Sequence, residues 1–185
     1  STITNALFAS GGVSEIGSLR NIQLKRAGRL VTTLDLYDLL LRGDSSDDLR
    51  LISGDVIFIP PVGKTAGITG EVRRPAIYEL KGESKASDLL YLAGGLLPDA
   101  DPRTATVERI DDSRMRVVLD VDLTIPSGRN LPLRSGDIMR LAAVRPQLAN
   151  AVTLGGNIYR PGVVAWRQGL RVADVLPRPE DLKPN

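Results

Sequence analysis

Residues 68–80, with the sequence ITGEVRRPAIYEL, and residues 87–95, with the sequence SDLLYLAGG, decide the fold. The first run alternates apolar and polar side chains until Arg74-Pro75 interrupts it. Proline fixes φ, lacks an N–H group and holds the preceding residue extended. Residues 76–80 then resume the extended pattern, so the sequence predicts an antiparallel hairpin with a proline turn.

A short helix is predicted directly after this hairpin. Ser84 or Ser87 can cap its start, and Gly94 suits the left-handed position just past its end. The predicted apolar stripe, at spacings of i, i+3, i+4 and i+7, consists of Ala86, Leu89, Leu90 and Ala93. Two strands, one helix and a pair of glycines therefore form the unit.

This unit recurs along the chain, which makes an internal repeat the first hypothesis. Three downstream matches are each 86 residues apart: Gly70 with Gly156, Pro75 with Pro161, and Asp88 with Asp174. Upstream matches are 82 to 85 residues apart: Gly11 with Gly94, Arg26 with Arg109, Asp35 with Asp120, and Asp55 with Asp137. The spacing changes only at turns, which indicates a repeated fold rather than chance similarity.

The order of these motifs resembles the soluble-ligand-binding β-grasp (SLBB) domain. The motifs that carry the resemblance are Gly70 to Pro75, Ala-Gly-Gly at residues 93–95, a predicted hairpin at 106–121, and the Ser-Gly-Asp that opens residues 135–141. The resemblance covers nearly the whole chain, which is similar to the tandem modules of bacterial polysaccharide export proteins.

Three segments follow from the repeat and the resemblance. Residues 1–64 are predicted to be a β-grasp module that lacks its first hairpin, residues 65–147 a complete module, and residues 148–185 the opening hairpin of a third. The last hairpin would complete residues 1–64 of the same chain or of a neighbouring chain, or stay loosely packed. The fold class is therefore α+β, with tandem β-grasp modules in which a small mixed sheet packs on one helix.

Two connections between predicted strands differ between the modules. Leu36, Leu39 and Leu40 are expected to make a short apolar helical turn that ends at Gly43. At the corresponding position of the second module, residues 126–130 are expected to form a loop.

The composition is that of an ordinary globular protein. The 185 residues are 42% hydrophobic and 25% charged, with a net charge of +2. This charge and the few aromatic residues do not favour nucleic acid as a partner. No apolar run is long enough to cross a bilayer, so we expect no direct membrane insertion by this stretch. No signal peptide is recognised, which predicts a chain that is already trimmed or cytosolic.

Most catalytic arrangements lack their central residue, because the chain contains neither histidine nor cysteine. The carboxylates that glycoside hydrolysis would need lie in predicted turns, where aspartate binds its own backbone; they are Asp99, Asp101, Asp111 and Asp112. The aspartates of residues 43–48 lack the ligand spacing of a calcium loop. We therefore predict no enzyme, no metal and no cofactor.

One cluster is a candidate ligand site. Arginines and aromatic residues flank the two proline turns, and guanidinium groups bind carboxylates, phosphates or hydroxyls while aromatic faces pack on sugar rings. The alternative is that the arginines belong to the turns and the aromatic rings are half-buried. The candidate residues are Arg73, Arg74, Tyr78, Tyr159, Arg160 and Trp166.

The resemblance implies a periplasmic role in a polysaccharide export protein attached to the outer membrane through parts outside this chain. It implies structural and interaction modules that help to assemble a ring, through which capsule or exopolysaccharide passes. The implied partners are further copies of the protein, the polysaccharide and an inner-membrane copolymerase. The alternative is a module that binds a soluble saccharide or small molecule on the β-grasp surface, since fold alone does not assign function.

Overall fold

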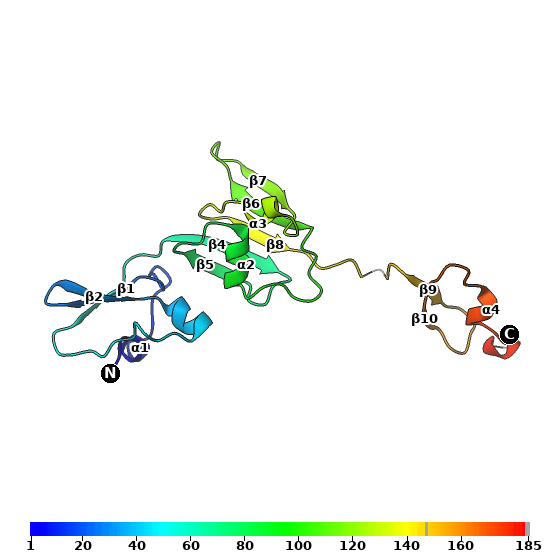
Figure 1. Cartoon of the computed structure of the whole chain (residues 1–185), viewed down its shortest axis with the longest axis horizontal. Coiled ribbons are helices and arrows are strands. Elements are labelled where there is room, and N and C mark those ends of the chain that lie inside the picture. Colours follow the sequence, from blue (N-terminus) through cyan, green and yellow to red (C-terminus); the bar gives the residue numbers. More distant parts are fainter. Residues whose placement is uncertain (147, 184–185) are drawn as a thin grey trace. The chain divides into compact units, whose positions relative to one another are not determined.

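The computed structural model describes residues 1–146 and 148–183. The chain divides into two compact units, Ser1–Val144 and Arg145–Asn185. Figure 1 shows the order of the elements within each unit. The first unit contains two sheets, and the second contains a hairpin with short helices.

The larger sheet of the first unit has five strands in the order β5-β4-β8-β6-β7. Its neighbouring strands are antiparallel except β4 and β8, which pair in parallel. The strands are β4 (Lys64–Gly70), β5 (Ala76–Leu80), β6 (Ala105–Ile110), β7 (Arg116–Val121) and β8 (Ile138–Leu141). The predicted proline hairpin is confirmed as β4–β5, and the sheet is mixed as expected.

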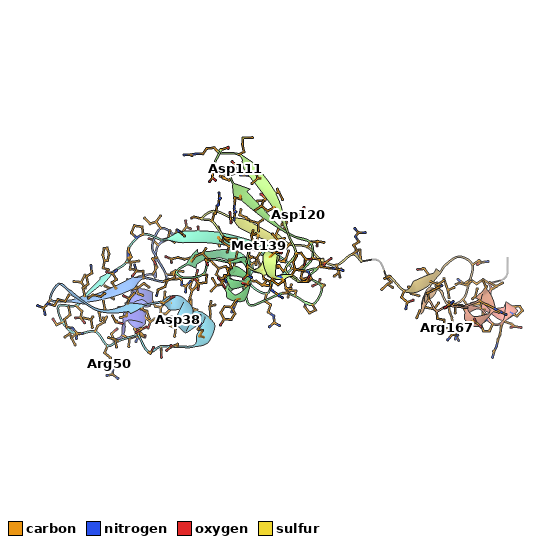
Figure 2. The ribbon with its side chains drawn as sticks, turned by 45° about the horizontal axis from the view of Figure 1, so that its top comes forward. Asp38, Arg50, Asp111, Asp120, Met139 and Arg167 are labelled. Carbon is orange, nitrogen blue, oxygen red and sulfur yellow. The ribbon has the colours of Figure 1, made fainter. Side chains whose placement is uncertain are left out.

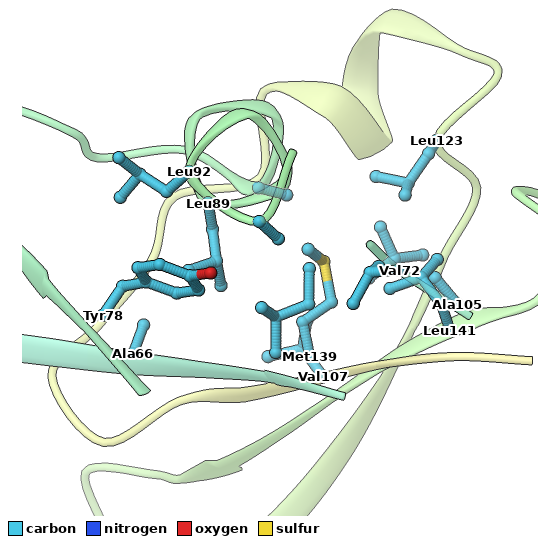
Figure 3. Packing of buried hydrophobic residues seen from close by; sticks show 14 residues of the cluster. Ala66, Val72, Tyr78, Leu89, Leu92, Ala105, Val107, Leu123, Met139 and Leu141 are labelled. Atoms are coloured by element: carbon cyan, nitrogen blue, oxygen red, sulfur yellow. The ribbon is translucent and has the colours of Figure 1, made fainter. Parts of the chain in front are cut away.

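Helix α2 (Ala86–Leu92) covers one face of this sheet. Met139 and Val107, from neighbouring strands, lie beneath Leu89 of the helix, and all three are fully buried (Figure 3). Burying a side chain of this size stabilises the fold by about 1.5–3 kcal/mol. Of the predicted apolar stripe, Ala86, Leu89 and Ala93 are buried in this core, whereas Leu90 is only partly buried and Leu92 is buried in addition.

The predicted serine cap of α2 is wrong. The helix begins after Lys85, and the Asp88 carboxylate accepts the N–H groups of Ser84 and Lys85 at 3.0 and 3.1 Å. A carboxylate in the first turn also interacts favourably with the positive end of the helix dipole, which a neutral hydroxyl does less well. The predicted stop is confirmed, because Gly94 has a φ of +80°.

The smaller sheet of the first unit has the order β2-β1-β3. Its strands are β1 (Ile22–Arg26), β2 (Arg29–Leu34) and β3 (Val56–Phe58), and the same part of the chain contains the helices α1 (Ile3–Ala9) and η1 (Asp38–Arg42). Strand β1 pairs antiparallel with both of its neighbours, as β6 does in the larger sheet. The spacing found in the sequence therefore corresponds to a recurring pattern of strand pairing.

The recurrence extends to side-chain contacts. Arg26 donates from Nε and Nη2 to the two carboxylate oxygens of Asp55, at 2.8 and 3.0 Å. Arg109 makes the same forked contact with Asp137, at 2.9 and 2.6 Å. Arg26 lies on β1 and Arg109 on β6, and each aspartate directly precedes the strand that pairs with its arginine's strand, β3 or β8, so each pair ties the turn to the sheet.

The loop predicted at residues 126–130 is wrong, because this segment contains helix α3 (Pro126–Arg129). Proline at the first helical position needs no N–H partner and has a φ already suited to the helix. The corresponding turn η1 of the first sheet is helical too, as predicted, and ends at Gly43 with a φ of +72°.

The second unit contains β9 (Ala151–Leu154), β10 (Gly162–Ala165), α4 (Val172–Val175) and η2 (Pro179–Asp181). Its two strands form a sheet of their own, as an antiparallel hairpin. The isolated bridge of Ile158 with Leu182 repeats that of Val72 with Leu96, again 86 residues apart. Completion of residues 1–64 by this hairpin stays a prediction.

Candidate functional site

The predicted cluster begins at the proline turn between β4 and β5, which is held against the end of α2. The N–H of Arg73 donates to Gly95 O at 3.1 Å, and that of Arg74 donates to Ala93 O at 2.9 Å. Tyr78 is buried, and its hydroxyl donates to Arg74 O at 2.7 Å. Its ring therefore supports the turn, which agrees with the alternative of a buried aromatic rather than with an exposed stacking surface.

A hollow of about 440 Å³ lies beside this turn and is lined by Leu41, Arg74, Ser87, Leu90, Tyr91, Gly94 and Gly95. We call it the Arg74 hollow. Helix α2 supplies Ser87, Leu90 and Tyr91, and η1 supplies Leu41. The hollow therefore combines one cation, one exposed aromatic ring and an apolar floor.

Tyr91 is the residue of this hollow that sequence reasoning missed. It lies on α2 next to the buried Leu92, yet 63% of it is exposed. The signal was that Tyr91 is not part of the apolar stripe and lies four residues after Ser87, a spacing that places the tyrosine on the same side of the helix as the serine.

The other three predicted residues belong to the second unit. Tyr159 and Trp166 are exposed there, and their backbone N–H groups donate to Asp181 O at 3.0 Å and Asn150 O at 3.2 Å. Arg160 occupies the position that Arg74 has 86 residues earlier. The structure thus brings together Arg73, Arg74 and the supporting Tyr78 in the first unit.

A second polar cluster joins the two sheets of the first unit. The carboxylate of Glu79, on β5, accepts the Ser18 hydroxyl at 2.7 Å and the N–H groups of Leu19 and Gly63, each at 3.0 Å. The N–H of Glu79 donates to the Tyr37 hydroxyl at 2.9 Å. Strand β5 is therefore fastened on both its side chain and its backbone to residues 1–63.

Arg20 is the centre of this junction. It donates to Asp35 at 3.1 Å, to Glu83 at 2.8 Å and to Glu79 O at 3.0 Å, and its guanidinium lies 4.6 Å from the centre of the Tyr37 ring. Arg20 and Asp35 are buried. Since a buried cation requires compensating partners, this Arg20 cluster makes residues 1–144 one compact unit.

The Arg20 cluster makes stability depend on pH. Burial of the Glu83 carboxyl opposes its ionisation, but hydrogen bonds from Arg20 and from the N–H groups of Lys81 and Gly82 outweigh it and lower the pKa of Glu83 from 4.5 to about 2. Likewise, the hydrogen bond from Arg26 and the Ile52 N–H lower the pKa of Asp55 from 3.8 to about 2.

We expect the first unit to lose stability as the pH falls from about 4.5 to about 2. Both carboxyl groups have lower pKa values in the folded state, so their contribution is complete above the unfolded values and disappears towards the folded ones. Urea unfolding followed by circular dichroism between pH 7 and pH 2 measures this loss. Glu83→Gln should reduce the pH dependence, and an unchanged slope would contradict the assignment.

Three of the four carboxylates considered for catalysis have structural contacts: Asp101, Asp111 and Asp112. Asp111, at the tip of the β6–β7 hairpin (Figure 2), accepts the N–H groups of Ser113 and Met115 at 2.9 and 2.8 Å. Asp101 accepts from Arg103, and Asp112 from Arg134, each in an exposed ion pair. Over the part of the chain that the structure describes, no group of three metal-ligating side chains occurs.

Comparison with known protein families identifies one domain. Residues 65–118 match the SLBB domain, so the chain contains one SLBB domain that begins in β4 and includes part of β7. SLBB domains are found in polysaccharide export proteins, and the domain implies a β-grasp-like fold. No helix among residues 1–146 and 148–183 is long and apolar enough to cross a membrane.

Proposed function

We propose that this chain is a structural and interaction part of a bacterial polysaccharide export protein, without enzymatic activity. In this role its tandem β-grasp modules sit in the periplasm and help subunits to assemble into a ring that conducts capsule or exopolysaccharide. The ring would contact an inner-membrane copolymerase and be attached to the outer membrane through other parts of the protein. The SLBB domain at residues 65–118 supports this assignment.

The observation that carries the assembly role is the outer edge of β3. In the larger sheet, β8 pairs with β6 on one side and with β4 on the other. In the smaller sheet, β3 pairs with β1 and, among the described residues, with no second strand. An exposed strand edge offers unpaired N–H and C=O groups to a strand of another chain. We propose that a strand of a neighbouring subunit pairs here.

Light scattering over a wide concentration range tests this proposal. We expect masses above the 19.9 kDa of one chain at high concentration. Val56→Lys should weaken association, because Val56 lies on the β3 edge with 57% exposure and a lysine there discourages edge pairing. Val118→Lys is the matched control, since Val118 is 61% exposed on the edge strand β7. A strict monomer at every concentration would contradict assembly by this chain.

A further inference from the structure

We propose that the Arg74 hollow binds a carboxylate-bearing sugar residue, with Arg74 receiving the carboxylate and Tyr91 packing against the sugar ring. The inference deepens the proposed export function, because it names an acidic polysaccharide as the polymer that the first unit contacts. It rests on that function for the source of the saccharide, whereas the site itself rests on the geometry of the first unit.

The shape of the hollow suits a ligand of this size. Its volume of about 440 Å³ lies within the range of roughly 300–1,000 Å³ typical of small-molecule sites. Leu41 and Leu90 give it apolar surface, and the Ser87 hydroxyl adds a hydrogen-bonding group. Sugars present both apolar C–H surface and hydroxyl groups, so this mixture of side chains complements them.

Arg74 determines the charge that the hollow accepts. One N–H of its guanidinium donates to Leu92 O at 3.2 Å, and an arginine side chain has five such donors. None of the described residues that line the hollow is acidic. Arg73, exposed in the same turn, adds a second positive charge nearby. A ligand carboxylate can therefore receive the remaining donors of Arg74 in the forked geometry that guanidinium groups favour.

The position of Arg74 is set before any ligand arrives. Tyr78 holds its carbonyl oxygen, Ala93 O accepts its N–H, and its guanidinium lies close to Gly94, within 3.4 Å of where a Cβ would be placed there. A cation that is held in place loses little conformational freedom on binding, which favours affinity.

Tyr91 provides the packing surface. Helix α2 turns Leu89 and Leu92 into the core, and Tyr91 remains on the outside with an exposed ring. An exposed tyrosine presents both an apolar face and a hydroxyl, the combination that packs against a sugar ring while binding its polar groups. Ser87 lies one helical turn before Tyr91 and lines the same hollow.

The test compares two probes with the same sugar chain: hexagalacturonate, which carries free carboxylates, and its full methyl ester, in which each carboxylate is replaced by a neutral ester. Isothermal titration calorimetry with the 185-residue chain at low ionic strength should detect binding of hexagalacturonate. We expect the methyl ester to bind about tenfold more weakly or not at all, because a charge-assisted fork at the carboxylate is lost. Absence of hexagalacturonate binding, or equal affinity for the ester, would overturn the proposal.

Matched variants locate the site. Arg74→Gln should weaken binding by about tenfold, whereas Arg116→Gln, which removes an equal charge from exposed β7, should leave it within about twofold. Tyr91→Ala should weaken binding, Tyr91→Phe should retain most of it, and Tyr159→Ala should have no effect. Tyr91 is exposed, so its variants report on binding even if Arg74→Gln is poorly folded.

Two further outcomes are decisive. Equal losses in Arg74→Gln and Arg116→Gln would show attraction by overall charge and overturn a defined site. Binding of a short peptide through its terminal carboxylate, without binding of hexagalacturonate, would overturn the saccharide class. Light scattering on the Tyr91 variants separates this proposal from the assembly role. Tyr91→Ala should bind the saccharide more weakly in calorimetry but associate as the unchanged chain does.

Discussion

Replacing Arg20 by methionine is expected to lower the free energy of unfolding of the first unit by about 3–5 kcal/mol. Methionine has a similar length but no charge and no N–H donors. Glu83 would remain largely buried without its cation, and the buried Asp35 would keep only the half-exposed Lys81, at 3.4 Å. The loss would also release Glu79 O, which binds the same guanidinium.

Urea unfolding monitored by far-ultraviolet circular dichroism measures this change. Arg103→Met is the control, because Arg103 is 69% exposed in an ion pair with Asp101 and such pairs contribute little. Hydrogen exchange should show faster exchange in residues 1–63 of the Arg20 variant, since the cluster fastens them to β5. Equal stability of the two variants would mean that the Arg20 cluster does not hold the sheets together.

The second large effect is expected at Gly70, where alanine should destabilise the first unit by about 3 kcal/mol or more. Gly70 has a φ of +86°, and a Cβ there would lie 2.0 Å from Leu141 O. No rotation of a side chain can remove this clash, because the backbone of β4 fixes the position of the Cβ and the oxygen belongs to the backbone of its paired strand β8. The parallel pairing must therefore open.

Gly136→Ala separates the clash from the backbone strain. Gly136 has a φ of +89°, and a Cβ there would meet no atom within 4 Å. Gly136→Ala should lower the free energy of unfolding only by the strain of an alanine in the left-handed conformation, about 1–2 kcal/mol. Urea unfolding measures the loss of unfolding free energy in both variants. The extra loss in Gly70→Ala is the part caused by the clash between β4 and β8. Equal losses for the two variants would contradict a close approach at Gly70.

Much of the fold was accessible from local patterns in the sequence. The extended run of residues 76–80, the proline turn and the apolar residues of α2 reflect short-range preferences that any chain with this pattern shares. The matches at 86 residues indicated which hairpins correspond. The prediction failed at the cap of α2 and at α3. At α2 the Asp88 carboxylate, rather than a serine, binds the free N–H groups, and at residues 126–129 the proline begins a short helix instead of a loop.

The candidate site was predicted in part. Arg74 was identified because it adjoins the proline, but its neighbours in space come from η1 and α2, which only the packing of the first unit brings together. For Tyr78 the sequence left two possibilities open, an aromatic ring that binds a ligand or one that is half-buried beside the turn. The structure places it inside, where its hydroxyl finds Arg74 O.

The sequence by itself indicated the recurring motifs, the β4–β5 hairpin, the glycine that ends α2 and the lack of histidine and cysteine, since these depend on residue type and short-range spacing. Only the tertiary structure decided that residues 1–64 and 65–144 share one compact unit, that β3 has no second partner strand among the described residues, and that Tyr91 and Arg74 line the same hollow. The physical reason is that buried charges and close backbone contacts, such as those of Arg20, take their partners from distant parts of the chain, and their energies depend on geometry that no local pattern specifies.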